Sequence, residues 1–236
     1  KITQPAIFLH SIAELIVLQE THLPNAVAGH SLGEFSSLVA NNTISFEDGL
    51  KLVFLRAKAM QKSCENSNGT MAAILGLDDK IIKETCESFD GNVTAANFNC
   101  PGQVVISGEL NAVKMICEKF NDIGARRSIL LPVGGAFHSN LMNDAKSELE
   151  EAIHKTKFNN PTCPIYQNFT AQKTTSIDII KQNLINQLTA PVLWTQTINN
   201  MVNDGYLDYT EVGPGKVLQG LIRKINRETI TQSALS

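Results

Sequence analysis

The motif Gly29-x-Ser31-x-Gly33 restricts the fold of this chain most, because it joins two patterns of different period. Residues 26–28 form a short apolar stretch typical of a strand, and residues 32–40 have the apolar spacing of a helix. A serine between two glycines in such a turn indicates a nucleophile elbow. The glycines let the two backbones pass close together, and the helix N-terminus can stabilise an oxyanion. The alternative is a serine that merely caps the helix.

A serine nucleophile needs a general base, and five histidines are available. His10 lies in an apolar helical pattern, and His22 and His154 lie in polar stretches, where a structural or surface role is the simpler interpretation. His30 adjoins the serine, but neighbouring side chains at a sharp turn point apart, so we expect it to shape the turn. His138 follows a predicted strand and two glycines, in a loop that can present a side chain to a cleft. We therefore expect His138 to be the base.

The third member of a hydrolase triad is missing from the pattern. The α/β-hydrolases place their acid between serine and histidine along the chain. Between Ser31 and His138, no Asp or Glu stands in an elbow-like context.

The remaining pattern predicts an α/β fold with a smaller α+β subdomain inserted in it. Helices are expected at residues 5–19, 32–40, 46–64, 141–156, 177–188, 194–204 and 216–227, and a strand at 209–212. The middle of the chain predicts strand 71–75, helix 79–89, strands 93–96 and 103–107, helix 110–123 and strand 127–131, a ferredoxin-like order. We assign residues 1–67 and 133–236 to a hydrolase-like core with a short parallel sheet, and residues 68–132 to the ferredoxin-like subdomain.

Composition argues against several other classes of protein. The net charge of −3 and the pI near 6.0 give no basic face for nucleic acid. The five cysteines form no Cys-x-x-Cys pair and no zinc-site spacing, and are typical of free thiols in a reducing compartment. No stretch has the roughly 18 apolar residues of a membrane span. We expect a cytoplasmic protein without metal, nucleic acid or membrane partner.

Several blocks of the sequence resemble, in order, the malonyl/acyl transferase family of fatty-acid and polyketide synthesis. The blocks are Gly29-His30-Ser31-Leu32-Gly33-Glu34, the arginine-bearing residues 52–61, residues 97–108, Phe137-His138-Ser139, residues 191–194 and residues 211–218. The resemblance covers about residues 4–227.

The resemblance implies transfer of a malonyl group from malonyl-CoA to the phosphopantetheine thiol of acyl carrier protein, by a ping-pong route through malonyl-Ser31. His138 would be the base and later the acid, oriented by the backbone carbonyl of Gln187 instead of a carboxylate. The backbone N–H of Leu32 would be an oxyanion donor. No bound cofactor is implied beyond the substrate and the carrier's phosphopantetheine, and we expect a monomer.

Arg56 stands on an otherwise apolar helix, where a buried guanidinium is costly unless it is paired. Its fork geometry suits a carboxylate held by two parallel hydrogen bonds, and malonyl carries such a carboxylate whereas acetyl does not. A structural ion pair with Glu34 or Asp48 is the alternative.

Three more residues are expected to line the substrate site. The resemblance places Phe137 beside the acyl Cα, in a pattern similar to that of malonyl-selective members, where it would crowd a branching methyl. Asn97 and Asn99 precede a Pro-Gly turn and are either ordinary turn residues or polar contacts to the pantetheine arm.

One departure from the family lies ahead of the serine motif. Family members carry a Gly-Gln-Gly-x-Gln loop roughly sixty residues before it, whose glutamine supplies a second oxyanion N–H, and this sequence holds no such loop. The sequence is then either a piece of a longer chain or an impaired enzyme.

Two other functions stay open at this point. One is a serine thioesterase or hydrolase, against which Arg56 and the missing acid argue. The other is a non-catalytic domain that only docks the acidic carrier protein through the basic residues Lys216, Arg223, Lys224 and Arg227, a cluster that is otherwise an ordinary solvated face.

Overall fold

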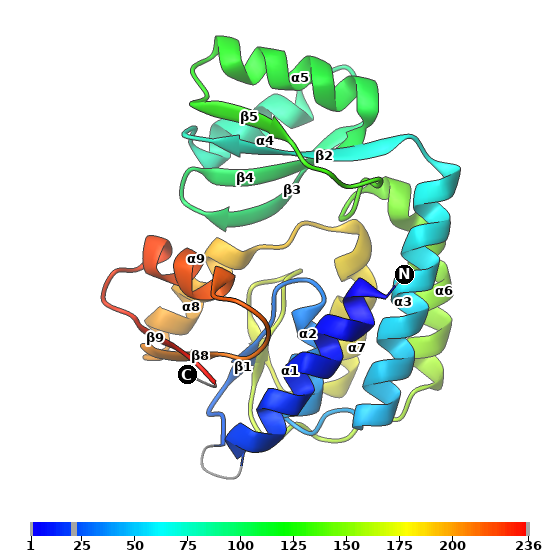
Figure 1. Cartoon of the computed structure of the whole chain (residues 1–236), viewed down its shortest axis with the longest axis vertical. Coiled ribbons are helices and arrows are strands. Elements are labelled where there is room, and N and C mark those ends of the chain that lie inside the picture. Colours follow the sequence, from blue (N-terminus) through cyan, green and yellow to red (C-terminus); the bar gives the residue numbers. More distant parts are fainter. Residues whose placement is uncertain (1, 20–22, 235–236) are drawn as a thin grey trace.

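The computed structural model describes residues 2–19 and 23–234, so His22 lies outside the described residues. Figure 1 shows two parts, a sheet with two helices at one end of the molecule and a larger α/β part at the other. The larger part contains α1 (Thr3–Gln19), β1 (Val27–Ala28), α2 (Gly33–Ala40), α3 (Phe46–Asn66), α6 (Asn143–Lys155), β6 (Ile165–Tyr166), β7 (Lys173–Thr174), α7 (Ile177–Asn186), α8 (Trp194–Asn203), β8 (Asp208–Glu211), α9 (Val217–Ile225) and β9 (Ile230–Ser233). The fold is mixed α/β, as predicted.

The smaller part is a four-stranded antiparallel sheet with two helices packed on it. Its elements are β2 (Gly69–Leu75), α4 (Asp79–Glu87), β3 (Val93–Cys100), β4 (Gln103–Glu109), α5 (Leu110–Asp122) and β5 (Arg127–Leu130), and the strand order is β3-β4-β2-β5. Ile82, Ile106, Ile116 and Phe120 fill the space between sheet and helices without solvent exposure. The division of the chain at residues 67 and 133 stays a prediction.

The larger part is built on very short strands. Strand β1 pairs in parallel with β6, in the register Val27↔Ile165, and β6 pairs antiparallel with β7. The parallel pair β8-β9 forms a separate sheet. The sequence pattern predicted neither β6, β7 nor β9. Strands this short show little alternation, and these three lack the glycine turn that follows the equally short β1 and β8.

Helices α1, α2, α3, α6 and α7 surround the core, which includes Phe8, Phe35, Leu38, Leu52 and Leu149. The predicted start of α3 is confirmed, because the Ser45 Oγ accepts the Asp48 backbone N–H at 3.1 Å. Helix α3 is the long helix that carries Arg56 toward the serine motif.

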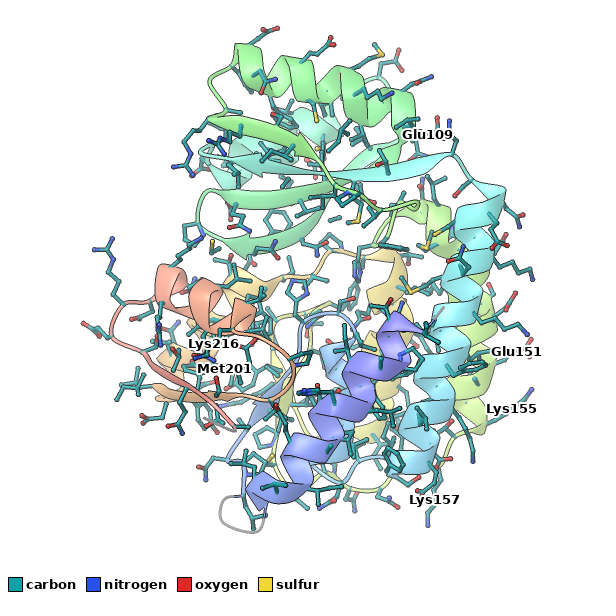
Figure 2. The ribbon with its side chains drawn as sticks, in the orientation of Figure 1. Glu109, Glu151, Lys155, Lys157, Met201 and Lys216 are labelled. Carbon is teal, nitrogen blue, oxygen red and sulfur yellow. The ribbon has the colours of Figure 1, made fainter. Side chains whose placement is uncertain are left out.

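Two expected boundaries were wrong. Strand β3 continues to Cys100, so Asn97 and Asn99 lie within a strand and the turn only follows them. Helix α9 spans Val217–Ile225, so Lys216 caps it and Arg227 lies beyond it, and the basic residues do not line one helix. In Figure 2, Lys216 lies on the opposite side of the view from Glu151 and Lys155 of α6.

A cavity of about 740 Å³ lies between α1, β1 and the β8 end of the chain. Its wall includes His30, Leu32 and Asn99, which places it next to the serine motif. Within the residues that the structure describes, no helix is both long and apolar enough to cross a membrane.

Candidate active site

Ser31 occupies the strained turn between β1 and α2, with a backbone φ of +52° that a residue with a side chain rarely adopts. A Cβ on Gly29 would lie 2.0 Å from the carbonyl carbon of Gly33, so only glycine fits at position 29. A Cβ on Gly33 would meet no atom within 4 Å. The two glycines of the motif therefore differ: the first permits the close approach, and the second is not required for it.

Ser31 and His138 are brought into direct contact, 2.8 Å between the serine Oγ and the histidine Nε2. The histidine Nδ1 lies 2.9 Å from the backbone carbonyl oxygen of Gln187. Because a carbonyl can only accept, Nδ1 carries the proton, and Nε2 is left as the acceptor for the serine hydroxyl. A histidine in this state can act as a general base toward Ser31.

His138 is almost fully buried, with 3% of its surface exposed, and its φ of +58° is also unusual. Burial, followed by the positive charge of Arg56, lowers the pKa of His138 to about 3. The imidazole is therefore neutral at pH 7 in the free protein.

Arg56 points its guanidinium at the serine and is 1% exposed. Its Nη2 donates to the Ser31 Oγ at 2.9 Å and to the Gln187 Oε1 at 3.3 Å, and its Nη1 donates to the Gln4 Oε1 at 2.6 Å. Burial lowers the pKa of Arg56 to about 10, so it stays charged at pH 7.

The alternative role for Arg56, an ion pair with Glu34 or Asp48, is not present among the described residues. Asp48 pairs with Lys51 on the exposed start of α3. Glu34 is fully buried and, when ionised, acts on Arg56 only through space, where it partly offsets the lowering of the arginine pKa by burial. Arg56 is thus held by neutral amides and the serine hydroxyl, an arrangement that leaves its charge available to an anion.

The Leu32 backbone N–H has no hydrogen-bond acceptor in the described part of the chain. It follows Ser31 directly and lies just before α2, where the helix dipole favours negative charge. The Gln187 side-chain amide donates to the Ser31 carbonyl oxygen at 2.9 Å and so keeps the turn in place. This geometry makes the Leu32 N–H a candidate oxyanion donor.

The other expected residues lie around this centre. The Asn99 Oδ1 accepts a hydrogen bond from the His30 Nε2–H at 2.9 Å, and Asn99 is 9% exposed. The Asn97 Oδ1 is buried without a partner among the described residues. Phe137 is partly buried and packs against the core beside His138. His30 makes no contact with Ser31 Oγ, and its ring lies 5.6 Å from that of Trp194.

Sequence reasoning missed three residues of this site. Gln4 holds Arg56 from the first turn of α1, but one glutamine in a helix start gives no signal. Glu34 was weighed only as an ion-pair partner, yet it accepts the backbone N–H of Asn168. Asn168 follows β6 and contacts the serine turn directly, and the shortness of β6 hid it.

This arrangement can perform acyl transfer, with a hydroxyl nucleophile, a neutral imidazole base, a free backbone N–H and a cation for an anionic acyl group. No cluster of three or more His, Cys, Asp or Glu that could hold a metal ion occurs in residues 2–19 and 23–234. All five cysteines are free thiols.

Comparison with known proteins supports the same chemistry. The family described as acyl transferase domain matches residues 1–235. A malonyl CoA-acyl carrier protein transacylase of Staphylococcus aureus is 40% identical over 229 residues, which are 96% of this chain and 74% of the relative. An acyl-carrier-protein S-malonyltransferase of Burkholderia pseudomallei superposes with a TM-score of 0.95 at 36% identity, covering 99% of this chain and 78% of that one. A malonyl-transacylase in complex with a type II PKS acyl-carrier protein superposes with a TM-score of 0.94 at 36% identity, covering 98% of this chain and 76% of the other.

Proposed function

Because the chain belongs to the acyl transferase domain family, we propose that it transfers a malonyl group from malonyl-CoA to the phosphopantetheine thiol of acyl carrier protein. It is an acyltransferase of fatty-acid synthesis, and its partners are malonyl-CoA and acyl carrier protein. The observation that carries the proposal is the contact of one hydroxyl, the Ser31 Oγ, with both a neutral imidazole and a buried guanidinium.

In the first half-reaction, Ser31 Oγ attacks the thioester carbonyl of malonyl-CoA while His138 Nε2 takes its proton. The carbonyl oxygen becomes an oxyanion, which accepts the Leu32 N–H. Collapse of the tetrahedral species breaks the C–S bond, and the histidine returns the proton to the sulfur. Coenzyme A leaves as a thiol, and malonyl-Ser31 remains.

In the second half-reaction, the phosphopantetheine thiol gives its proton to His138 and attacks the malonyl ester. The same oxyanion donor serves this step, because the carbonyl occupies the same place. Cleavage of the C–O bond returns the proton to Ser31 and releases the malonyl thioester on the carrier. The Gln187 carbonyl keeps the imidazole in one tautomer through both steps.

Arg56 has the role of binding the malonyl carboxylate by two parallel hydrogen bonds. Supporting this role, its Nη groups are held by uncharged partners that a carboxylate can displace. Pairing with the substrate would also cancel the positive charge that helps to lower the His138 pKa, and so strengthen the base once malonyl is bound.

The substrate wall includes three further residues in this proposal. Phe137 crowds the acyl Cα and excludes a branching methyl. Asn99 contacts the pantetheine arm, a role supported by its place in the wall of the cavity beside His30. Asn97 contributes its unpaired Oδ1 to the same arm. The ferredoxin-like residues 68–132 form the subdomain that supplies both asparagines.

The reaction needs no cofactor beyond malonyl-CoA and the phosphopantetheine thiol of the carrier, since proton transfer and charge stabilisation are all done by protein groups. The enzyme works as a monomer in the cytoplasm, and five free thiols are what a reducing compartment favours.

The decisive experiment follows malonyl through both half-reactions. Malonyl-CoA alone should add a malonyl group to Ser31, detected by intact mass and peptide mapping, and Ser31→Ala should abolish it. Phosphopantetheinylated carrier protein should then remove the group from the serine and gain it. Release of free malonate faster than transfer would identify a hydrolase, and the absence of any adduct would leave only carrier docking.

A further inference from the structure

Each polar group of Asn168 has a hydrogen-bond partner, and its side chain holds the serine turn. Its Oδ1 accepts the Ser31 backbone N–H at 2.6 Å, and its Nδ2 donates to the Gly29 carbonyl oxygen at 2.7 Å. Its backbone N–H is accepted by a Glu34 carboxylate oxygen, and its carbonyl oxygen accepts the Leu193 N–H at 3.0 Å. The residue is fully buried.

The two side-chain bonds of Asn168 hold the backbone that leads into the strained residue, Ser31. One bond reaches the peptide between His30 and Ser31, and the other reaches the peptide between Gly29 and His30. The Gln187 side chain holds the Ser31 carbonyl on the other side, so the orientation of the peptide before Ser31 depends on Asn168. A φ of +52° costs on the order of 1–3 kcal/mol for a residue with a side chain and persists only where its surroundings over-determine it. Asn168 supplies that constraint.

The same bonds decide which N–H is free for an oxyanion. The Ser31 N–H is already bound to Asn168, whereas the Leu32 N–H has no acceptor among the described residues. Without Asn168 the peptide before Ser31 could rotate, and both the Oγ and the Leu32 N–H would lose their places.

Glu34 completes the arrangement from the helix that follows the turn. Its carboxylate accepts the Asn168 backbone N–H, and it is fully buried on the first turn of α2. Asn168 therefore connects the serine turn, helix α2 and the segment that follows β6 through hydrogen bonds.

We propose that Asn168, held by Glu34, is a positioning residue that sets the backbone of Ser31 for acylation. The inference rests on the proposed function, since it concerns the serine that accepts malonyl. The bonds of the Asn168 side chain go to backbone groups, so it acts through the Gly29 and Ser31 peptides.

The test compares Asn168→Ala with Asn41→Ala. Asn41 is also a fully buried amide that bridges two segments, through its Nδ2 to the Cys163 carbonyl at 3.1 Å, but it does not touch the serine turn. Rates of Ser31 malonylation are measured by quenched intact mass and divided by the folded fraction. Asn168→Ala should lower kcat about 10-fold to 100-fold with KM for malonyl-CoA within about threefold, because a misplaced nucleophile still has Arg56 to bind substrate. Asn41→Ala should lower the melting temperature but not kcat.

Asn168→Asp keeps the proposal testable if the alanine variant does not fold. A protonated aspartic acid can accept the Ser31 N–H with one oxygen and donate to the Gly29 carbonyl with the other, whereas the carboxylate repels that carbonyl. Its malonylation rate, relative to the unsubstituted protein at the same pH, should rise as pH falls from 8 to 5 by at least about fivefold.

The malonylation rate of Asn168→Asp is divided by that of the unsubstituted protein because other groups near the serine turn also titrate. They are Glu34, Arg56, His30 and His138, and all four are present in both proteins. A pH-independent ratio, or an Asn168→Ala kcat equal to that of Asn41→Ala, would overturn the positioning role. An unsubstituted chain that gains no malonyl group would instead overturn the proposed function.

Discussion

The guanidinium of Arg56 donates a hydrogen bond to the Oγ of Ser31 across 2.9 Å, so the cation and the nucleophile share one site before any substrate arrives. In the proposed reaction, a malonyl group esterified to that oxygen would bring its carboxylate within reach of the same guanidinium. The proposal therefore assigns selectivity for the acyl group to a side chain that contacts the residue accepting that group.

Arg56→Ala should lower malonyl transfer far more than acetyl transfer. Two charge-assisted hydrogen bonds at about 1.5 kcal/mol each correspond to a loss on the order of 100-fold in kcat/KM for malonyl-CoA. Acetyl-CoA has no carboxylate and should lose less than about tenfold. Arg56→Lys is the matched control, since it keeps the charge but not the fork-shaped guanidinium. Its kcat/KM for malonyl-CoA should lie between that of the unsubstituted protein and that of Arg56→Ala. Equal losses on both thioesters would contradict the carboxylate role.

Phe137→Ala should increase the turnover of methylmalonyl-CoA relative to malonyl-CoA. One methyl group in an apolar pocket changes selectivity by about 10-fold to 200-fold, and removal of the ring makes room for it. Phe158→Ala is the control, because Phe158 is partly buried against the same core cluster and lies over Lys181, away from the serine. Competition between the two thioesters measures the ratio. Comparable turnover of both by the unsubstituted protein would contradict the proposed exclusion.

The acylation rate should show no loss of activity from protonation of His138 between pH 7 and pH 5. Burial and Arg56 lower the pKa of His138 to about 3, so the base stays neutral from pH 7 down to pH 5. The kcat/KM for a malonyl thioester without phosphate groups should change less than about threefold over this range. An unperturbed histidine with a pKa of about 6.5 would instead lose more than tenfold.

The sequence predicts those parts of the fold and the site that are marked by residues adjacent in the chain. The serine turn, the His138 loop and the Arg56 helix are each marked by a few adjacent residues, such as glycines or one charge on an apolar helix. The order of the longer helices and strands was predictable for the same reason. Strand β6 has two residues, Ile165 and Tyr166, and is defined only by pairing with β1 from the other end of the chain.

Residues that act through long-range contacts were beyond sequence reasoning. Gln4 reaches Arg56 across 52 positions and Asn168 reaches Ser31 across 137, and no local pattern records either contact. The Gln187 carbonyl is a backbone atom, so its residue type carries no signal at all, and only the family resemblance pointed to it. The glycine motif misled in one respect, because Gly33 has open space where a Cβ would be.

Gly29→Ala and Gly33→Ala should therefore have opposite outcomes. A Cβ at position 29 would overlap the backbone of residue 33 at 2.0 Å, and we expect a loss of at least about 3 kcal/mol in unfolding free energy, or no folded protein. A Cβ at position 33 meets nothing within 4 Å, and alanine there should change stability by less than about 1 kcal/mol. Urea unfolding of both variants measures the difference. Similar losses would show that the motif needs both glycines.

Glu34→Gln should change how stability depends on pH. Burial raises the pKa of Glu34 to about 8 from a model-compound value of 4.5, against the Asn168 N–H that favours its charged form. Between these values the folded chain binds more protons at this group than the unfolded chain does. The stability it contributes is fully present below pH 4.5 and is lost as pH rises toward 8.

The measurement is the unfolding free energy of both proteins in urea from pH 5 to 8. The free energy of the unsubstituted protein should fall relative to Glu34→Gln by up to about 1.4 kcal/mol per pH unit. His30 and His138, whose pKa values are lowered, bias stability in the opposite direction in both proteins, so their contribution cancels in the difference. Glu47→Gln removes a carboxylate from the exposed first turn of α3 and controls for a change in net charge. Parallel curves for Glu34→Gln and the unsubstituted protein would mean that the Glu34 carboxyl is ionised in the folded chain at neutral pH.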